Sequence, residues 1–361
     1  MEVTNKDILK HYLSSVLVYG LVLVLLFIIP AFNQDVPNPY ISSLTVLLTY
    51  YILYVVFAYP IFKKLRPESV LTSRSVVIVE YLKKIFKKLP PEEKLTVLTM
   101  NEDEKQAFVI LFIKAFFGSY CLSLLCNKYL PQLVYDFDFL NALFNNSMFY
   151  AQNNGFWGGV IQFIDDTADM WLILMFMITN LVLAFSYLTE ANIFKNKIKY
   201  ADTSFLGVFS CIICYYPFIL LTEKIMPVTL KELVPVENAP VRISLYILVI
   251  IANLIMTISV LRLGTKSGNL TNRGVVTGFP YNIVRHPEYA MRILYVILTI
   301  IPMYIIGELS VLGNIVLTAG MLMWILVYVI RAVTEERNLI KDDDYKNYMQ
   351  KVKHRFIPFV V

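Results

Sequence analysis

The residues best suited to chemistry lie near the end of the chain, in two polar clusters within an otherwise hydrophobic polypeptide. The first is the stretch PYNIVRHPEYAMRIL, residues 280–294, which holds two arginines, a histidine and a glutamate. The second is RAVTEE, residues 331–336, which holds an arginine and two consecutive glutamates. Charged groups in apolar surroundings are costly unless they are paired or solvated. The two clusters therefore indicate a functional site.

The composition identifies the surroundings of these clusters as a membrane. The chain has 361 residues, of which 57% are hydrophobic and 16% charged, and its mean hydropathy is +0.61. Apolar runs of about 18 residues or more recur, and a segment that crosses a bilayer must satisfy its own backbone, so the spans must be helices. We predict an all-α, polytopic membrane protein with about eight transmembrane helices, at residues 14–32, 41–62, 107–126, 170–192, 205–222, 243–261, 289–306 and 311–330.

The basic residues predict the orientation. If the N-terminus is cytoplasmic, most of the 32 Lys and Arg residues fall on inner segments, and four fall outside: Lys128, Lys224, Lys231 and Arg242. This asymmetry follows the positive-inside rule. Both termini and both polar clusters are then cytoplasmic, because the short turn GELS, residues 307–310, pairs the last two spans.

We divide the chain into an N-terminal membrane region, residues 1–262, and a C-terminal region, residues 263–361. The first contains an inner loop, 63–105, and an aromatic, acidic outer loop, 127–169. Within the inner loop we predict a basic amphipathic helix, ending at Pro90–Pro91, that lies on the membrane surface with its lysines near anionic headgroups. Its apolar face is Ile78, Tyr81, Leu82, Ile85 and Leu89, and its basic face is Lys83, Lys84, Lys87 and Lys88.

Two groups of residues that resemble metal sites are interpreted otherwise. Asp165, Asp166 and Asp169 have a spacing used to hold magnesium against a diphosphate, but a single copy is too little to predict such a site. The three histidines are dispersed along the chain. We therefore expect no metal.

General rules for helices predict the positions of some residues in the two clusters. Pro287 fits the first turn of the seventh span, where its missing N–H is not needed and the neighbouring N–H groups can face an anion. Arg331 and Glu335 are four residues apart, so we expect them to be partners on one helix face.

Together the two clusters resemble the C-terminal signature of a known group of proteins, the integral membrane methyltransferases. This group includes isoprenylcysteine carboxyl methyltransferases, phospholipid N-methyltransferases and bacterial relatives. The resemblance covers roughly residues 265–361. The matching positions are Pro280, Tyr281, Arg285, His286, Pro287, Tyr289, Arg331, Glu335, Glu336, Leu339, Tyr345, Tyr348, Ile357 and Pro358.

The chain departs from the group's pattern at three places that bear on cofactor geometry. Phe279 and Met291 stand where the group usually has glycine, and a side chain there restricts how closely backbone and ligand approach. The tail is also shorter between Leu339 and Tyr345, where Asp342–Asp344 replace a customary Phe-Gly.

The resemblance implies an enzyme that uses S-adenosylmethionine, bound on the cytoplasmic side by the last two spans and the tail, and a lipophilic acceptor that enters from the bilayer. Arg285 and His286 would hold the cofactor's carboxylate, and Glu335 or Glu336 its ammonium or ribose. Arg331 would orient Glu335 or neutralise an acidic acceptor. The implied cofactor-binding residues are Tyr281, Arg285, His286, Pro287, Tyr289, Glu335 and Glu336, and the implied catalytic residues are Arg331 and Glu335.

Several alternatives stay open. The acceptor is an isoprenylcysteine carboxylate, a phospholipid amine, or a small lipophilic thiol or quinol. A sterol-type membrane reductase that uses NADPH resembles the same hairpin, although Pro287 and the consecutive glutamates favour the methyltransferase. A non-catalytic lipid-binding membrane protein is the third hypothesis. We expect membrane lipids and no nucleic acid as partners, and the oligomeric state and the host membrane are left open.

Overall fold

The computed structural model describes residues 2–29, 42–87, 99–225, 236–307 and 309–358. The predicted all-α class is confirmed, since helices make up most of the described residues and the strands among them are one short antiparallel pair. Seven of the described helices are long and apolar enough to cross a membrane. The chain forms two compact units, Met1–Asn127 and Lys128–Val361. The predicted boundary between residues 262 and 263 lies inside the second unit. It marks where the resemblance to the methyltransferases begins, and a domain division at this point stays a prediction.

The first unit contains three long apolar helices and one shorter amphipathic helix. The first long helix packs against the second and against the amphipathic helix, and the third packs against the same two. The first long helix begins with a capping box, in which Thr4 and Asp7 bond each other's backbone N–H groups. The elements are α1 (Asn5–Ile28), α2 (Ser43–Leu65), η1 (Glu68–Val70), α3 (Arg74–Phe86) and α5 (Glu102–Leu124), after which the π-helical turn η2 (Leu125–Tyr129) begins.

Helix α3 is the predicted amphipathic helix, but its apolar face lies against protein. Ile78 and Val79 are buried against Val18 of α1 and Ala107 of α5. Lys84 donates to Glu104 at 2.7 Å. The prediction that this face lies on the membrane surface is therefore wrong, because neighbouring helices already cover it. Lys88, Leu89 and Pro90–Pro91 lie outside the described residues.

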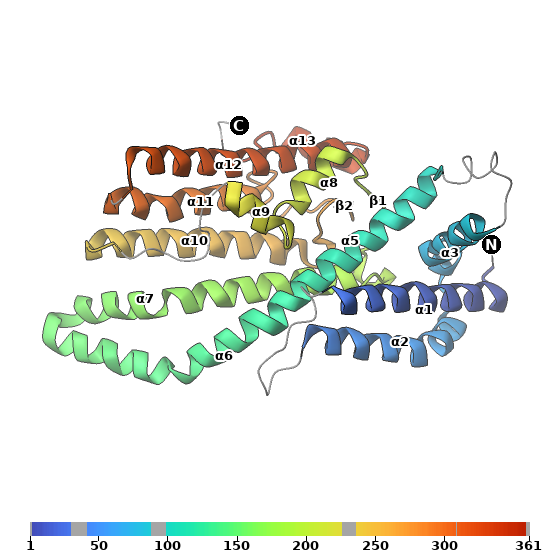
Figure 1. Cartoon of the computed structure of the whole chain (residues 1–361), viewed down its shortest axis with the longest axis horizontal. Coiled ribbons are helices and arrows are strands. Elements are labelled where there is room, and N and C mark those ends of the chain that lie inside the picture. The colour runs from blue at the N-terminus through green and yellow to red at the C-terminus, as the bar shows by residue number, and fades with distance from the viewer. Residues whose placement is uncertain (1, 30–41, 88–98, 226–235, 308, 359–361) are drawn as a thin grey trace. The chain divides into compact units, whose positions relative to one another are not determined.

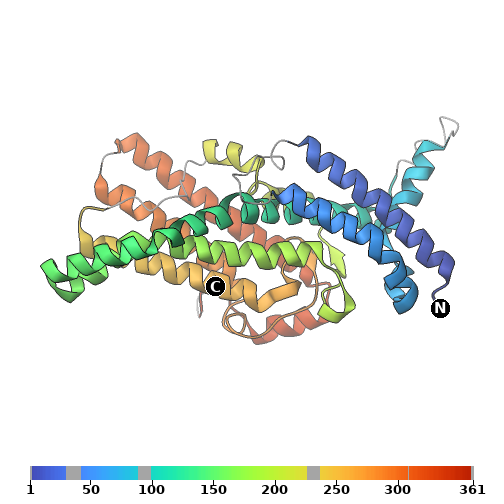
Figure 2. The same ribbon diagram turned by 90° about the horizontal axis from the view of Figure 1, so that it is seen from below.

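The second unit contains the site. Its helix α10 packs against α7 on one side and α11 on the other, and α11 packs against α12 (Figure 1; Figure 2). The elements are α6 (Leu130–Asp138), α7 (Leu140–Leu188), η3 (Asn192–Phe194), β1 (Tyr200–Ala201), α8 (Phe205–Ile212), α9 (Phe218–Ile225), α10 (Ala239–Leu263), η4 (Gly264–Lys266), β2 (Thr271–Asn272), α11 (Pro287–Ile306), α12 (Val311–Leu339) and α13 (Asp343–Lys351).

The prediction that residues 127–169 form a loop is wrong, since this segment forms α6 and the first part of α7. Within α7, Gly155 alone has non-helical backbone angles, with φ 77°. Asp165 of the acidic trio accepts from Arg242 of α10, Nε to Oδ1 at 2.9 Å and Nη2 to Oδ2 at 2.7 Å. Asp166 accepts from Asn146 at 2.9 Å and Gln162 at 2.7 Å. Polar residues in this stretch suggested a loop, but they bond to one another across helices.

The predicted fifth span, residues 205–222, is not one helix. It is divided into α8 and α9, of 8 residues each, and Thr222 Oγ1 donates back to the carbonyl of Ile213 at 2.9 Å across the break. Yet α7 and α10 run parallel, because Asp165 bonds Arg242 near the start of α10 and Ser186 bonds Thr265 just past its end. The chain between them must therefore return along the length of the unit, and α8 and α9 lie on that return. Neither α8 nor α9 is among the described helices that are long enough to cross a membrane, so a crossing by this segment stays a prediction.

A cap of short segments joins the ends of α7, α10 and α12. Tyr200 and Ala201 pair with Asn272 and Thr271 in the β1–β2 ladder. The buried Arg273 donates through Nη1 to the carbonyl of Ser186 at 2.9 Å, which satisfies a carbonyl that the end of α7 leaves open.

Asp342 ties the tail to this cap. It begins α13 as the N-cap residue, and its Oδ2 accepts from Lys199 at 2.5 Å and from Asn272 at 3.1 Å. Burial by itself would raise the pKa of this carboxyl, but the hydrogen bonds from Lys199 and Asn272 and the charge of Lys199 hold the pKa below its usual value. The acidic tail that departs from the methyltransferase pattern is thus a local anchor.

We predict that Asp342→Asn lowers stability only where Asp342 is ionised. Because the folded-state pKa is lowered, the ion pair stabilises the protein above the unfolded pKa of about 3.9, and this stability is lost as the pH falls through the folded value. The expected cost at neutral pH is about 1 kcal/mol, since Lys199 is half exposed and the pair is screened. Thermal unfolding of the detergent-solubilised protein at neutral and acidic pH measures it. Asp343→Asn, at a side chain that is 88% exposed, is the control and should change little at either pH.

Candidate functional site

One face of α12 forms the floor of a cleft of about 330 Å³, a volume that includes the open solvent at its mouth. Arg331, Thr334, Glu335 and Asn338 are spaced i, i+3, i+4 and i+7, so they share this face. The other walls come from α11, α8 and the β1–β2 cap. The remaining lining residues are Asp202, Gly207, Cys211, Leu270, Thr271, Tyr289 and Leu339.

Arg331 is held in the cleft wall by aromatic rings and an amide. Its guanidinium carbon lies 5.0 Å from the ring centroid of Tyr289 and 5.9 Å from that of Tyr328. Its Nη2 donates to Asn269 Oδ1 at 2.8 Å. The predicted pairing with Glu335 does not form; Glu335 instead accepts from the Tyr289 hydroxyl at 2.9 Å. The two rings and the amide hold the arginine in place and use one of its five N–H groups, and Glu335 remains available at the cleft surface.

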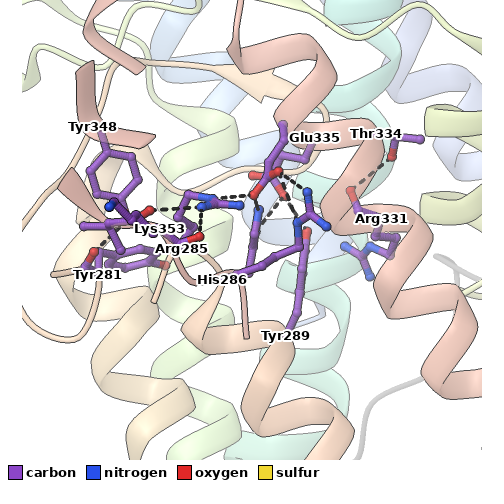
Figure 3. A network of polar contacts seen from close by, with 12 residues as sticks. Tyr281, Arg285, His286, Tyr289, Arg331, Thr334, Glu335, Tyr348 and Lys353 are labelled. Atoms are coloured by element: carbon purple, nitrogen blue, oxygen red, sulfur yellow. Dashed lines mark hydrogen bonds and ion pairs between the residues drawn. The ribbon is translucent and has the colours of Figure 1, made fainter. Parts of the chain in front are cut away.

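Glu336 points away from the cleft into a buried network, because successive residues of a helix are about 100° apart. Its Oε1 accepts from Arg285 Nε at 2.7 Å and lies 3.2 Å from His286 Nε2. Its Oε2 accepts from Arg355 Nη2 at 2.6 Å. Glu336 is only 5% exposed, so these partners compensate a charge that is almost fully removed from water. Figure 3 shows Arg285 and His286 reaching from the start of α11 toward this end of α12.

The tail binds the same place through its backbone. The N–H groups of Arg285 and His286 donate to the carbonyls of His354 at 2.9 Å and Arg355 at 3.0 Å. Arg285 Nη1 donates to the carbonyl of Val352 at 3.0 Å. Pro287 is the first residue of α11, as predicted. The RHP motif therefore both starts a helix and anchors the tail.

Tyr281 belongs to the packing of the tail. It is buried with Tyr345, Tyr348 and Val352, and its carbonyl accepts from the Tyr348 hydroxyl at 2.6 Å. Burial raises the pKa of both Tyr281 and Tyr348, so both hydroxyls stay protonated at neutral pH.

The predicted site residues thus divide into two sets. The structure brings Arg331, Glu335 and Tyr289 together around the cleft. It places Arg285, His286 and Glu336 in the network behind it, with Pro287 and Tyr281 in the adjoining turn and tail. Direct contact of this second set with a cofactor stays a prediction. Neither Phe279 nor Met291 is among the residues that line the described cleft.

Three residues of the site were missed by sequence reasoning. Asp202 lines the cleft, Asn269 holds Arg331, and Arg355 completes the pairing of Glu336. Asp202 and its neighbour Ser204 precede an apolar run, which is a helix-start signal that could have drawn attention to the segment. Nothing in the spacing of Asn269 or Arg355 indicated their partners.

A second cavity, of about 370 Å³, lies among the membrane-crossing helices α7, α10, α11 and α12. Aromatic and apolar side chains line it together with Arg292 and Asn253. Arg292 also bonds Glu288 at 3.3 Å. The lining residues are Phe176, Asn253, Met256, Arg292, Tyr295, Val296 and Tyr328.

The two cavities adjoin across a wall of three side chains. Tyr289 lines the cleft and Tyr328 lines the membrane cavity, and their ring centroids are 6.1 Å apart. Arg331 packs on both rings. The cleft and the cavity are therefore separated by the packed side chains of Tyr289, Tyr328 and Arg331.

The chain was compared with protein-family models, with curated proteins and with solved structures, and it matches none of them. The argument for function therefore depends on the geometry of the site and on the resemblance in the C-terminal motifs.

We predict that the two consecutive glutamates have different phenotypes. Glu336→Gln leaves Arg285 and Arg355 without their buried counter-charge and should lower the free energy of unfolding by about 3 kcal/mol. Glu335→Gln removes a charge from a side chain that is 35% exposed and should cost less than about 1 kcal/mol. Unfolding of the two variants side by side in one detergent tests this, and equal losses would contradict the division of the site.

Proposed function

We propose that the protein is an integral membrane methyltransferase that moves a methyl group from S-adenosylmethionine to a lipophilic acceptor. The observation that carries the proposal is that the cleft, lined by one guanidinium and two carboxylates, lies beside an aromatic cavity among the membrane-crossing helices, with Tyr289, Tyr328 and Arg331 between the two. A reaction between a polar donor and a lipid acceptor requires two such compartments that touch at the reacting atoms.

The charges of the cleft fit the sulfonium cofactor. At neutral pH the cofactor carries a carboxylate, an ammonium and a positive sulfur. Arg331 offers a partner for the carboxylate, Glu335 and Asp202 offer partners for the positive groups and hydroxyls, and the Tyr289 ring suits a sulfonium.

The same charges disfavour the reductase alternative. A nicotinamide dinucleotide phosphate carries several negative charges, and its phosphates need several cations or helix N-termini. Arg331 is the one basic side chain among the residues that line the described cleft, and two carboxylates accompany it.

When bound, the cofactor supplies an electrophilic methyl group. The chain's own residues would hold and orient the reactants and keep water out, which is sufficient for an in-line displacement. Tyr289 and Tyr328 would position the acceptor beside the bound cofactor, since they lie between the cleft and the cavity. A carboxylate acceptor needs no base, whereas an amine must first lose a proton, which the carboxylate of Glu335 in the cleft could accept.

The distribution of basic residues supports a cytoplasmic site. The end of the second unit that holds the cleft carries many lysines and arginines in the segments after α7, α10 and α12, and the positive-inside rule favours the cytoplasm for that end. These residues include Lys195, Lys197, Lys199, Lys266, Arg273, Arg337, Lys341, Lys346, Lys351, Lys353 and Arg355.

We expect the detergent-purified protein to bind S-adenosylmethionine, measured by calorimetry, and not NADPH. Glu335→Gln should weaken this binding about 10-fold or more through loss of a charge-assisted hydrogen bond. Glu237→Gln is the matched control, since it makes the same change just before α10, outside the cleft. Transfer of labelled methyl into the lipid extract of a membrane that contains the protein tests the reaction itself. Binding of NADPH alone would establish the reductase, and binding of neither would leave a non-catalytic lipid-binding role.

A further inference from the structure

Asp202 carries a buried carboxylate oxygen that the fold leaves without a partner. The residue is 6% exposed and lies between β1 and α8, where it lines the cleft. Its Oδ1 accepts from the N–H of Ser204 at 2.9 Å, while its Oδ2 has no hydrogen-bond partner. Burial of such an oxygen is costly unless a donor meets it.

A structural role accounts for only one of the two oxygens. Oδ1 shapes the turn that leads into α8, and Ser204 caps that helix by accepting from the Gly207 N–H at 3.2 Å. The cap is complete without Oδ2. An asparagine would make the same turn without a buried negative charge, so the charge itself calls for an explanation.

The backbone around Asp202 makes room for this carboxylate. A Cβ at Gly207, the third residue of α8, would lie 2.1 Å from Oδ2. Gly207 also lines the cleft. A glycine here therefore lets the carboxylate lie against the first turn of α8 at the cleft wall.

We propose that Asp202 binds the ammonium group of a ligand whose carboxylate is bound by Arg331, so that the cleft recognises an α-amino acid end. A carboxylate and a guanidinium in one cleft are the complement of a zwitterion. This inference rests on the proposed function, under which the zwitterion is the methionine end of S-adenosylmethionine. Asp202 lies outside residues 265–361, so part of the cofactor's specificity comes from the segment with no resemblance to the methyltransferases.

The test compares ligands with and without the amino acid end. S-adenosylmethionine and S-adenosylhomocysteine carry it, and 5′-methylthioadenosine lacks it. In calorimetry on the full-length protein, Asp202→Asn should weaken the first two about 10- to 100-fold and leave methylthioadenosine within about 2-fold of the wild type. Retained methylthioadenosine binding also shows that the variant is folded. Asp343→Asn is the matched control and should change none of the three.

A second variant moves the carboxylate and keeps its charge. In Gly207→Ala the new methyl group would displace Oδ2, so the same selective loss of the two amino acid ligands is expected. Unchanged binding of S-adenosylhomocysteine to both variants would overturn the proposal, as would an equal loss for methylthioadenosine. Failure of the wild type to bind S-adenosylmethionine would instead overturn the proposed function, and the inference with it.

Discussion

The arrangement of the second unit around the cleft depends on one interaction, the pairing of the buried carboxylate of Glu336. This carboxylate lies in low-dielectric surroundings and is neutralised by Arg285 from the start of α11 and Arg355 from the tail, with His286 beside them. The two arginines come from different segments, so their pairing with Glu336 of α12 fixes α11, α12 and the tail relative to one another. Much of the two polar clusters that stand out in the sequence therefore belongs to this buried ion-pair network, which stabilises the fold. The cleft lies on the neighbouring face of α12.

Two neighbouring glutamates show how helix geometry separates structure from chemistry. Glu335 and Glu336 differ by one residue and therefore by about 100° around α12. One faces the tyrosine and the cleft, and the other faces two arginines. In the sequence the two glutamates look like a single acidic pair. In the structure Glu336 stabilises the fold, whereas Glu335 is available to a ligand.

The sequence predicted the features that depend on neighbouring residues, such as helix positions. It did not predict the contacts that depend on residues far away in the chain. Apolar runs placed the long helices, and helix-start rules placed Pro287, because both need only neighbouring residues. The membrane-surface position of α3 was wrong because an apolar face gives no sign of whether lipid or protein covers it. Arg331 was assigned to Glu335 by spacing, but Asn269, 62 residues away, accepts from it instead. Asp202 was missed because its helix-start signal locates the start of α8 but does not indicate that the side chain lines a cleft with α12.

The break between α8 and α9 has a consequence for the order in which the protein is synthesised and folds. Irregular backbone at membrane depth is tolerated only where protein encloses it, and here Ile213, Cys214 and Ile219 pack against the cluster of α11 and α12 that contains Trp324. Those helices are synthesised after α8 and α9, and Ser204 itself bonds Arg337, 133 residues later. The segment therefore leaves the ribosome long before its enclosure exists. The final shape of this segment, and of the cleft wall that α8 provides, must therefore be acquired after α11 and α12 have been synthesised.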